Sequence, residues 1–205
     1  MKNNKILILF AHPLYEKSHA HKAMIKHIPK SEHITFHDLY EAYPEFNVNI
    51  KREQTLLEAH DIIIWQHPMY WYSCPPLLKQ WIDMVLEYNW AYGINGNALK
   101  DKVIFQVITT GGKKENYATT GRDRYTIQEL LEPFNQTAKV CKMVYLPPYV
   151  VHGTHIMKAD DYETSGRAYG ELLSKLLKMD LPKEQILKYP YFNEWCQNEM
   201  TAYGN

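Results

Sequence analysis

Three segments of the sequence carry side chains whose types and spacing suit the binding of a small anionic or aromatic ligand. In the first segment, His12 is followed by Ser18, His19, Ala20 and His21. Serine favours the N-cap of a helix, and a helix N-terminus attracts anions, so this segment predicts a cradle for a phosphate group. An ordinary capped helix without a ligand is the simpler interpretation of this segment taken alone.

The histidines of the first segment also allow a metal site as an alternative. His19 and His21 have the H-x-H spacing that metal sites use, and His12 lies a few residues before them. However, no partnering carboxylate pattern accompanies these histidines. We therefore expect no metal centre here.

The second segment contains three consecutive aromatic residues, Tyr70, Trp71 and Tyr72, with Pro68 and Met69 before them and two prolines after them. Prolines lower the entropy lost when a loop is ordered, and aromatic planes suit a flat heteroaromatic ligand. A loop packed against its own helix is the alternative, and it explains one aromatic residue better than three.

In the third segment, Thr109 and Thr110 are followed by Gly111 and Gly112, and Tyr117 lies five positions further on. Two glycines allow backbone N–H groups to approach a ligand closely, although a simple glycine turn would look the same.

The three segments together supply a phosphate cradle, an aromatic wall and a glycine-rich clamp, which are the parts needed to bind a mononucleotide with a flat ring. No G-x-G-x-x-G follows the first apolar run and no G-x-S-x-G is present, which disfavours a dinucleotide-binding Rossmann site and a serine hydrolase.

Short apolar runs identify the elements that must position these segments. Such runs are typical of strands buried in a parallel sheet, and they occur at 5–11, 61–66, 102–109 and 143–146, with a weaker one at 33–37. Helical patterns occur at 75–87, 126–139 and 162–178, and Pro133 is expected to divide the second of them. This alternation predicts an α/β fold, a doubly wound sheet of five parallel strands with helices on both faces. In such a sheet the ligand lies outside the carboxyl ends of the strands, which is where the three segments fall.

The composition excludes several classes of protein. Lys and Arg together number 23, as do Asp and Glu, and no basic run indicates a nucleic-acid partner. The apolar run at the N-terminus is short and lacks a small-residue cleavage site, so it predicts a first strand, not a signal peptide. Three widely spaced cysteines favour a reducing cytoplasm over a disulfide framework. Cys74 lies near an expected helix start, but no base is within reach along the sequence, so we expect a packed, inert thiol.

The sequence resembles the bacterial NAD(P)H:quinone oxidoreductases of the flavodoxin-like fold. The resemblance rests on five stretches that occur in order: AHPLYEKSHAH, LYEAYPEFNVNI, HPMYWYSCPPLLKQWID, WAYG and TTGG. Within that group it is greatest to the ancillary proteins of glutathione-gated potassium-efflux systems and to related general-stress oxidoreductases. It extends from the first strand to about residue 177, so we expect a flavin-binding domain at 1–178 and a C-terminal extension at 179–205. The aromatic residues of the extension, Tyr203 among them, suggest docking on its own subunit or on a neighbour.

The resemblance implies a bound flavin, FMN in most close relatives and FAD in some larger ones, which passes a hydride from NAD(P)H to a quinone-like acceptor by ping-pong kinetics. It places the phosphate around His12, Ser18, His19, Ala20 and His21. It also implies that Pro68, Met69, Tyr70 and Trp71 flank the ring, and that Thr109, Thr110, Gly111, Gly112 and Tyr117 hold its pyrimidine side. Tyr117 is then the candidate catalytic residue, as a donor to the flavin. The family is typically a homodimer.

Two positions depart from the family pattern. The first segment usually ends S-x-x-N, whereas this chain has His21, which can still donate to a phosphate but with a charge that depends on pH. Animal relatives place a His shortly after the Tyr, where this chain has Gly121, Arg122 and Asp123. We therefore expect Tyr117 to act without a proton relay.

Three other functions remain open at this stage. A regulatory subunit of a potassium-efflux transporter would be a binding function, and it would place this cytoplasmic chain at the inner face of the membrane through its partner. A one-electron carrier flavodoxin is disfavoured because such chains are strongly acidic and this one is neutral. A flavin-free packing module would have little use for three ligand-facing loops.

Overall fold

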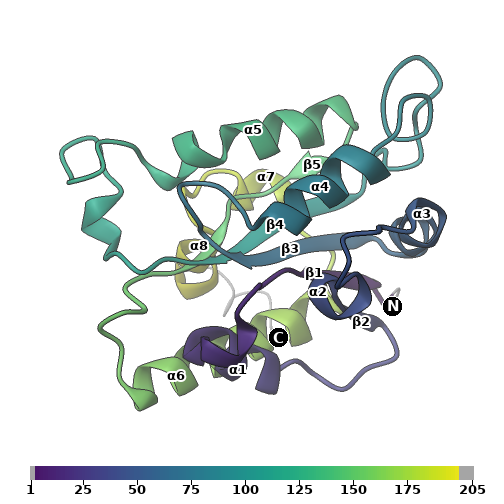
Figure 1. Cartoon of the computed structure of the whole chain (residues 1–205). Coiled ribbons are helices and arrows are strands. Elements are labelled where there is room, and N and C mark those ends of the chain that lie inside the picture. Colours follow the sequence, from purple (N-terminus) through teal and green to yellow (C-terminus); the bar gives the residue numbers. More distant parts are fainter. Residues whose placement is uncertain (1–2, 199–205) are drawn as a thin grey trace.

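Buried apolar segments form the strands of one central sheet in the computed structural model, which describes residues 3–198 (Figure 1). The strands are β1 (Ile6–Phe10), β2 (Ile34–Asp38), β3 (Ile62–Pro68), β4 (Val103–Thr109), β5 (Val144–Tyr145) and β6 (Tyr149–Val151). The five predicted apolar runs correspond to β1 to β5. The sequence pattern did not reveal β6.

The sheet is parallel throughout and has the order β2-β1-β3-β4-β5, with β6 also pairing with β4. Val103 of β4 pairs with Val144 of β5, and Val107 of β4 pairs with Tyr149 of β6. Pro147 and Pro148 lie between β5 and β6, and neither has an N–H group to donate to the ladder. The strand at this edge is therefore interrupted. The order confirms the predicted flavodoxin-like sheet, in which the chain turns from β1 to opposite sides for β2 and β3.

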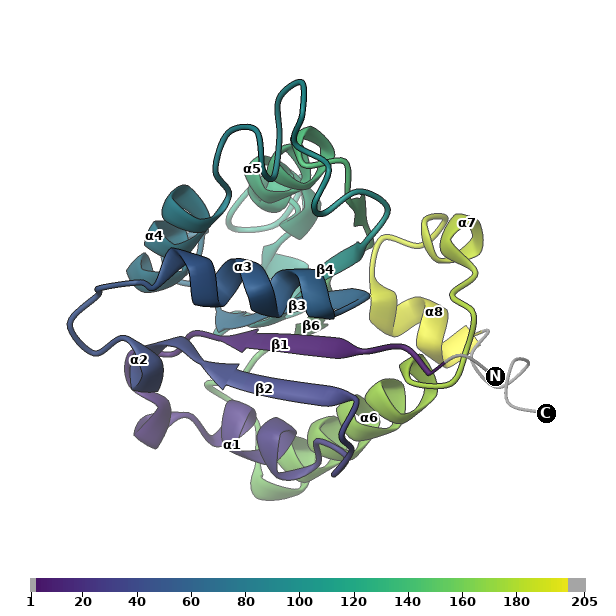
Figure 2. The same cartoon turned by 90° about the vertical axis from the view of Figure 1, so that its right-hand side faces the viewer.

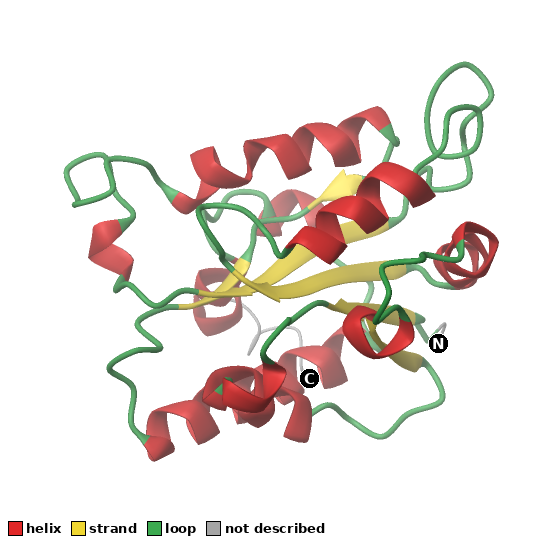
Figure 3. Cartoon of the chain, viewed as in Figure 1, coloured by secondary structure: helices red, strands yellow, loops and turns green. Residues whose placement is uncertain are grey.

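Helices cover both faces of the sheet (Figures 1 and 3). One face carries α3 (Ile50–Ala59), α4 (Pro76–Val85) and α5 (Ile127–Val140), and the short α2 (Leu39–Ala42) packs with them. The other face carries α1 (His19–Lys26), α6 (Ala159–Leu176), α7 (Lys183–Ile186) and α8 (Phe192–Asn198). Alternate residues of each inner strand belong to the two separate cores, as the period of two in a strand requires.

The prediction that Pro133 divides its helix is wrong, because α5 runs through it. A proline inside a helix destabilises it by about 3 kcal/mol. Two features offset this effect. Thr126 and Glu129 form a capping box at the start of α5, and Ile127 and Phe134, on either side of the proline, are buried on the same face.

The described part of the C-terminal extension packs on its own chain (Figure 2). Phe192 and Trp195 of α8 are fully buried, and the Phe192 ring lies 4.9 Å from that of Phe105 in β4. Tyr203 lies outside the described residues. Within residues 3–198, no helix is long and apolar enough to cross a lipid bilayer.

Candidate functional site

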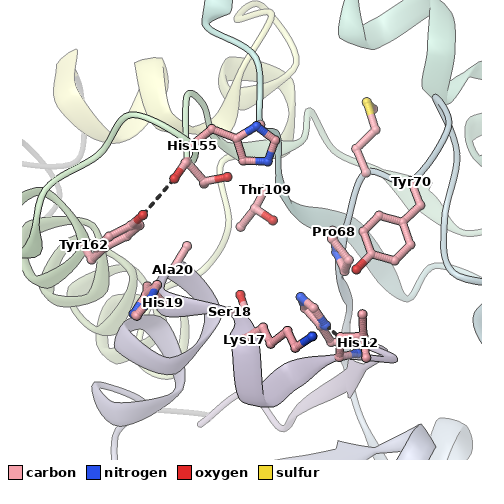
Figure 4. Close-up of a pocket in the computed structure, with 14 residues that line it drawn as sticks. His12, Lys17, Ser18, His19, Ala20, Pro68, Tyr70, Thr109, His155 and Tyr162 are labelled. Carbon is pink, nitrogen blue, oxygen red and sulfur yellow. Dashed lines mark hydrogen bonds between the residues drawn. The ribbon is translucent and has the colours of Figure 1, made fainter.

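A cavity of about 550 Å³ lies beyond the carboxyl ends of β1, β3 and β4 (Figure 4). Residues that follow β1 and residues at the end of β3 both line it, so it lies at the point where the strand order reverses. Nine residues that the sequence predicted line this cavity: His12, Ser18, His19, Ala20, Pro68, Met69, Tyr70, Thr109 and Gly111. Five further lining residues were not predicted: Leu14, Lys17, Thr154, His155 and Tyr162.

One end of the cavity presents hydrogen-bond donors and a positive charge. The side chain of Ser18 caps α1 by accepting from the His21 N–H at 3.2 Å, as predicted. The remaining N–H groups of the first helical turn have no partner within the helix, and they form the electropositive end of its dipole. The side chain of Lys17 lies beside them (Figure 4). This end of the cavity therefore suits an anion.

His12 adds a donor whose direction is set by the backbone. The Leu14 N–H donates to His12 Nδ1 at 3.1 Å, so the neutral ring carries its proton on Nε2. Burial lowers the pKa of His12 to about 4, which keeps the ring neutral at pH 7. His12 therefore offers an N–H group to a ligand in the cavity, not a full charge.

The loop after β6 and the start of α6 close the side of the cavity that the sequence did not predict. The Tyr162 hydroxyl donates to the Thr154 carbonyl at 2.7 Å, and the Tyr162 ring packs 5.6 Å from that of His19 (Figure 4). The His155 ring lies so close to Gly111 that a Cβ there would come within 2.4 Å of it. A side chain at position 111 would therefore displace the exposed His155 ring, and this contact appears only once the loops are brought together.

The aromatic segment after β3 forms a tight turn. The Ser73 N–H donates to the Tyr70 carbonyl at 3.0 Å, and the two central residues, Trp71 and Tyr72, have positive φ angles of 47° and 62°. Positive φ is unfavourable for bulky residues, at about 1–3 kcal/mol each, and such conformations cluster at functional sites. Tyr70 lines the cavity, whereas the Trp71 side chain is 93% exposed. The turn thus presents a large aromatic surface next to the cavity.

The His21 side chain lies beneath the cavity, not in it. It is fully buried, and its ring nitrogens are 3.3 Å from Gln66 Nε2 and 3.1 Å from Thr109 Oγ1. Burial, with a smaller effect from His12, holds the pKa of His21 well below its ordinary value. The prediction of a phosphate contact with a pH-dependent charge is therefore wrong for this side chain.

Thr110, Gly112 and Tyr117 also do not line the cavity. The Thr110 hydroxyl donates to the Gly112 carbonyl at 2.9 Å and lies 3.0 Å from His152 Nδ1. Tyr117 is partly buried beside them, and its ring centre is 5.8 Å from that of His152. These residues form a second layer next to the cavity wall.

Other candidate chemistry finds little support around this site. Burial raises the pKa of the Cys74 thiol to about 11, which agrees with the expected inert cysteine. Among the residues that the structure describes, no three His, Cys, Asp or Glu side chains are placed to hold a metal ion together.

Comparisons with known proteins agree with the fold. Residues 4–174 match a family model described as flavodoxin-like fold. The potassium-efflux ancillary protein KefG of Pectobacterium atrosepticum is 43% identical over 88% of this chain and 97% of its own length. A general stress protein 14 of Treponema denticola, solved in complex with FMN, is 39% identical with a TM-score of 0.79, over 84% of this chain and 99% of that one. An NADPH-quinone reductase of P. pentosaceus is 33% identical with a TM-score of 0.74, over 82% and 96%. The chain belongs to this family of proteins with a flavodoxin-like fold.

Proposed function

We propose that this chain is an FMN-dependent NAD(P)H:quinone oxidoreductase. The observation that carries the proposal is the cavity at the switch point of the sheet, which combines donors after β1 and at the start of α1 with an aromatic turn after β3. A relative solved with FMN and a relative named as a quinone reductase support it.

The residues present fit FMN. His12, with its Nε2–H, would hold the phosphate together with Lys17 and the first turn of α1, while Pro68 and Tyr70 would flank the ring. Trp71, at the open side of the turn, would cover the ring or the acceptor. FAD remains an alternative cofactor with the same phosphate contact.

Bound FMN would take a hydride from NAD(P)H and pass the electrons to a quinone-like acceptor. The chain's own part is to place the ring with one face accessible and to supply hydrogen-bond donors. No protein nucleophile is required, and the raised pKa of Cys74 agrees with that. Both substrates would use the same ring face in turn, which is the basis of the proposed ping-pong mechanism.

The test is whether the chain carries flavin. Purified protein should be yellow and should release one flavin per chain on denaturation, with chromatography separating FMN from FAD. Stripped protein should regain its colour with FMN and then reduce a simple quinone with NADH or NADPH. If neither FMN nor FAD restores a bound species, the proposal is wrong.

A second role rests on the similarity to KefG. We propose as the alternative that the chain is a regulatory subunit of a potassium-efflux transporter, cytoplasmic and held at the inner face of the membrane by that partner. Deleting the gene should then change potassium efflux, and a variant without FMN should still bind the transporter. The absence of a transporter among cross-linked partners would count against this role and would leave the enzymatic proposal unaffected.

A further inference from the structure

A chain of buried polar side chains runs from α6 to the floor of the cavity. Tyr169 Oη lies 2.9 Å from Gln66 Oε1, and Gln66 Nε2 lies 3.3 Å from His21 Nδ1. His21 Nε2 lies 3.1 Å from Thr109 Oγ1. Tyr169, Gln66 and His21 are all fully buried, and Thr109 lines the cavity.

The direction of this chain follows from Tyr169. Its hydroxyl proton has one acceptor among residues 3–198, the Gln66 side chain. If the Gln66 amide were turned round, its NH₂ would donate to the phenol and the Tyr169 proton would be buried without an acceptor. Such an unsatisfied donor is strongly unfavourable, so Tyr169 donates to Oε1, and the Gln66 NH₂ group faces His21.

The same argument determines the tautomer of His21 and the hydrogen-bonding role of the Thr109 hydroxyl. Because His21 Nδ1 accepts from Gln66, the neutral ring carries its proton on Nε2 and donates it to Thr109 Oγ1. The hydroxyl proton of Thr109 then needs another acceptor. In Figure 4 the Thr109 hydroxyl points into the cavity between the phosphate end and the aromatic turn.

We propose that His21 is a positioning residue that, as its Nε2–H tautomer, sets the Thr109 hydroxyl as a hydrogen-bond donor to an acceptor atom of the cofactor. This inference rests on the proposed FMN site. His21 would then not contact the phosphate directly, as the sequence had predicted. Instead, Tyr169 of α6 would determine, through Gln66 and His21, that the Thr109 hydroxyl donates and does not accept.

The first experiment determines the tautomer, and it does not depend on activity. Nitrogen NMR of the full-length, ¹⁵N-histidine-labelled chain at pH 7 should show His21 protonated on Nε2 and unprotonated on Nδ1, with and without FMN. The Tyr169→Phe variant removes the proton that orients Gln66, so the Nδ1–H tautomer of His21 should appear. Finding the Nδ1–H tautomer in the wild-type chain would overturn the proposal.

The second experiment measures FMN affinity by quenching of flavin fluorescence. Thr109→Val removes the donor and should weaken binding about 3- to 10-fold, the effect of one lost hydrogen bond, whereas Thr109→Ser should restore near-wild-type affinity. Tyr169→Phe should weaken binding by a smaller factor in the same direction. The matched control is Tyr149→Phe, because Tyr149 packs 5.9 Å from Tyr169 but lies outside the hydrogen-bonded chain.

The outcomes separate the two proposals. If the wild-type chain binds no flavin, the proposed function fails, and this inference fails with it. If it binds FMN but Thr109→Val binds equally well, only the inference fails. Equal weakening by Tyr149→Phe and Tyr169→Phe would indicate a packing effect and would also overturn it.

Discussion

The ring of Tyr117 lies 5.8 Å from the ring of His152, although the two residues belong to different loops. The sequence after Tyr117 offers no nearby histidine, yet the chain that follows β6 brings one to this position. Burial lowers the pKa of His152 to about 4, and burial raises the pKa of Tyr117. At pH 7 both side chains are therefore neutral, and Tyr117 retains its proton.

Replacing Tyr117 with Phe should slow flavin reduction by a few-fold to roughly a hundred-fold. Tyr117 lies in the layer behind the cavity wall, so its phenol would stabilise charge that develops on the cofactor from that layer, beside Gly112. Losing one such donor raises a barrier by about 0.5–3 kcal/mol, at about 1.4 kcal/mol per tenfold in rate. Flavin content should stay nearly unchanged because the phosphate end is separate. Stopped-flow reduction at saturating NAD(P)H measures the effect, with the exposed Tyr125→Phe as control. A wild-type rate for Tyr117→Phe would exclude it from the chemistry.

The strand pattern was predictable because buried parallel strands are continuous apolar runs, and β1, β3 and β4 are each entirely buried. Residues that directly follow such strands, such as His12, were therefore placed correctly at the cavity. In contrast, β6 has three residues and follows two prolines, so its pattern is too short to recognise. The continuation of α5 past Pro133 depends on the packing of both halves of the helix, which the local sequence does not encode.

The site itself was only partly predictable. The position of His21 along the chain predicted a contact with the phosphate. On α1, however, its side chain lies beneath the cavity, next to Gln66 of β3. Thr154, His155 and Tyr162 reach the cavity from a distant loop and helix, and no motif marks them. The strand order could have indicated these three residues, because it places the end of β6 next to the end of β4.

Steady-state kinetics with NAD(P)H and a quinone should give parallel lines in double-reciprocal plots. The physical reason is that both substrates would use one exposed ring face, so the first product must leave before the acceptor binds. Initial rates measured over a grid of both concentrations test this. Intersecting lines, together with a ternary complex in binding experiments, would contradict the shared site.

The chain should be a homodimer in solution. Trp71 is 93% exposed next to the cavity, where a second chain would bury it and cover the open side of the proposed flavin site. Light scattering should give twice the 24.2 kDa mass of one chain. Trp71→Ala should shift the dimer towards monomer, whereas Leu187→Ala, at an exposed site on the C-terminal extension, should not. Full activity at the mass of a single chain would refute the dimer.

Stability should fall as the pH drops from about 6.5 towards 4. Burial lowers the pKa of His67 from 6.5 to about 4, and that of His12 likewise. For a lowered histidine pKa, the unfolded chain binds the proton first, so the contribution is complete above 6.5 and is lost as the pH falls towards the folded value. For the fully buried His67, the loss amounts to about 3 kcal/mol at about 1.36 kcal/mol per pKa unit. Urea unfolding across this range measures it, and His67→Gln should reduce the slope. A flat profile between pH 7 and 5 would contradict the prediction.

A buried carboxylate should make the largest single contribution among the polar groups of the α3 face. Glu53 is fully buried, and it accepts from Tyr43 Oη at 2.5 Å, Trp81 Nε1 at 2.8 Å and His37 Nε2 at 2.9 Å. Burial alone would raise its pKa, but the hydrogen bonds from His37, Tyr43 and Trp81 outweigh burial and lower it. The carboxylate thus joins β2, α3 and α4 at one point.

Glu53→Leu should therefore lower the free energy of unfolding by about 3–5 kcal/mol at pH 7, because it leaves three buried donors without their acceptor. Glu45→Gln, at an exposed position, should change it by less than about 0.5 kcal/mol. For a lowered carboxyl pKa, the stabilisation is complete above the ordinary value of 4.5 and is lost as the pH falls through the folded value, so the difference between wild type and variant should narrow there. Urea unfolding at pH 7 and at pH 3 checks both statements. A difference that stays the same at the two pH values would mean that the charge of Glu53 does not stabilise the fold.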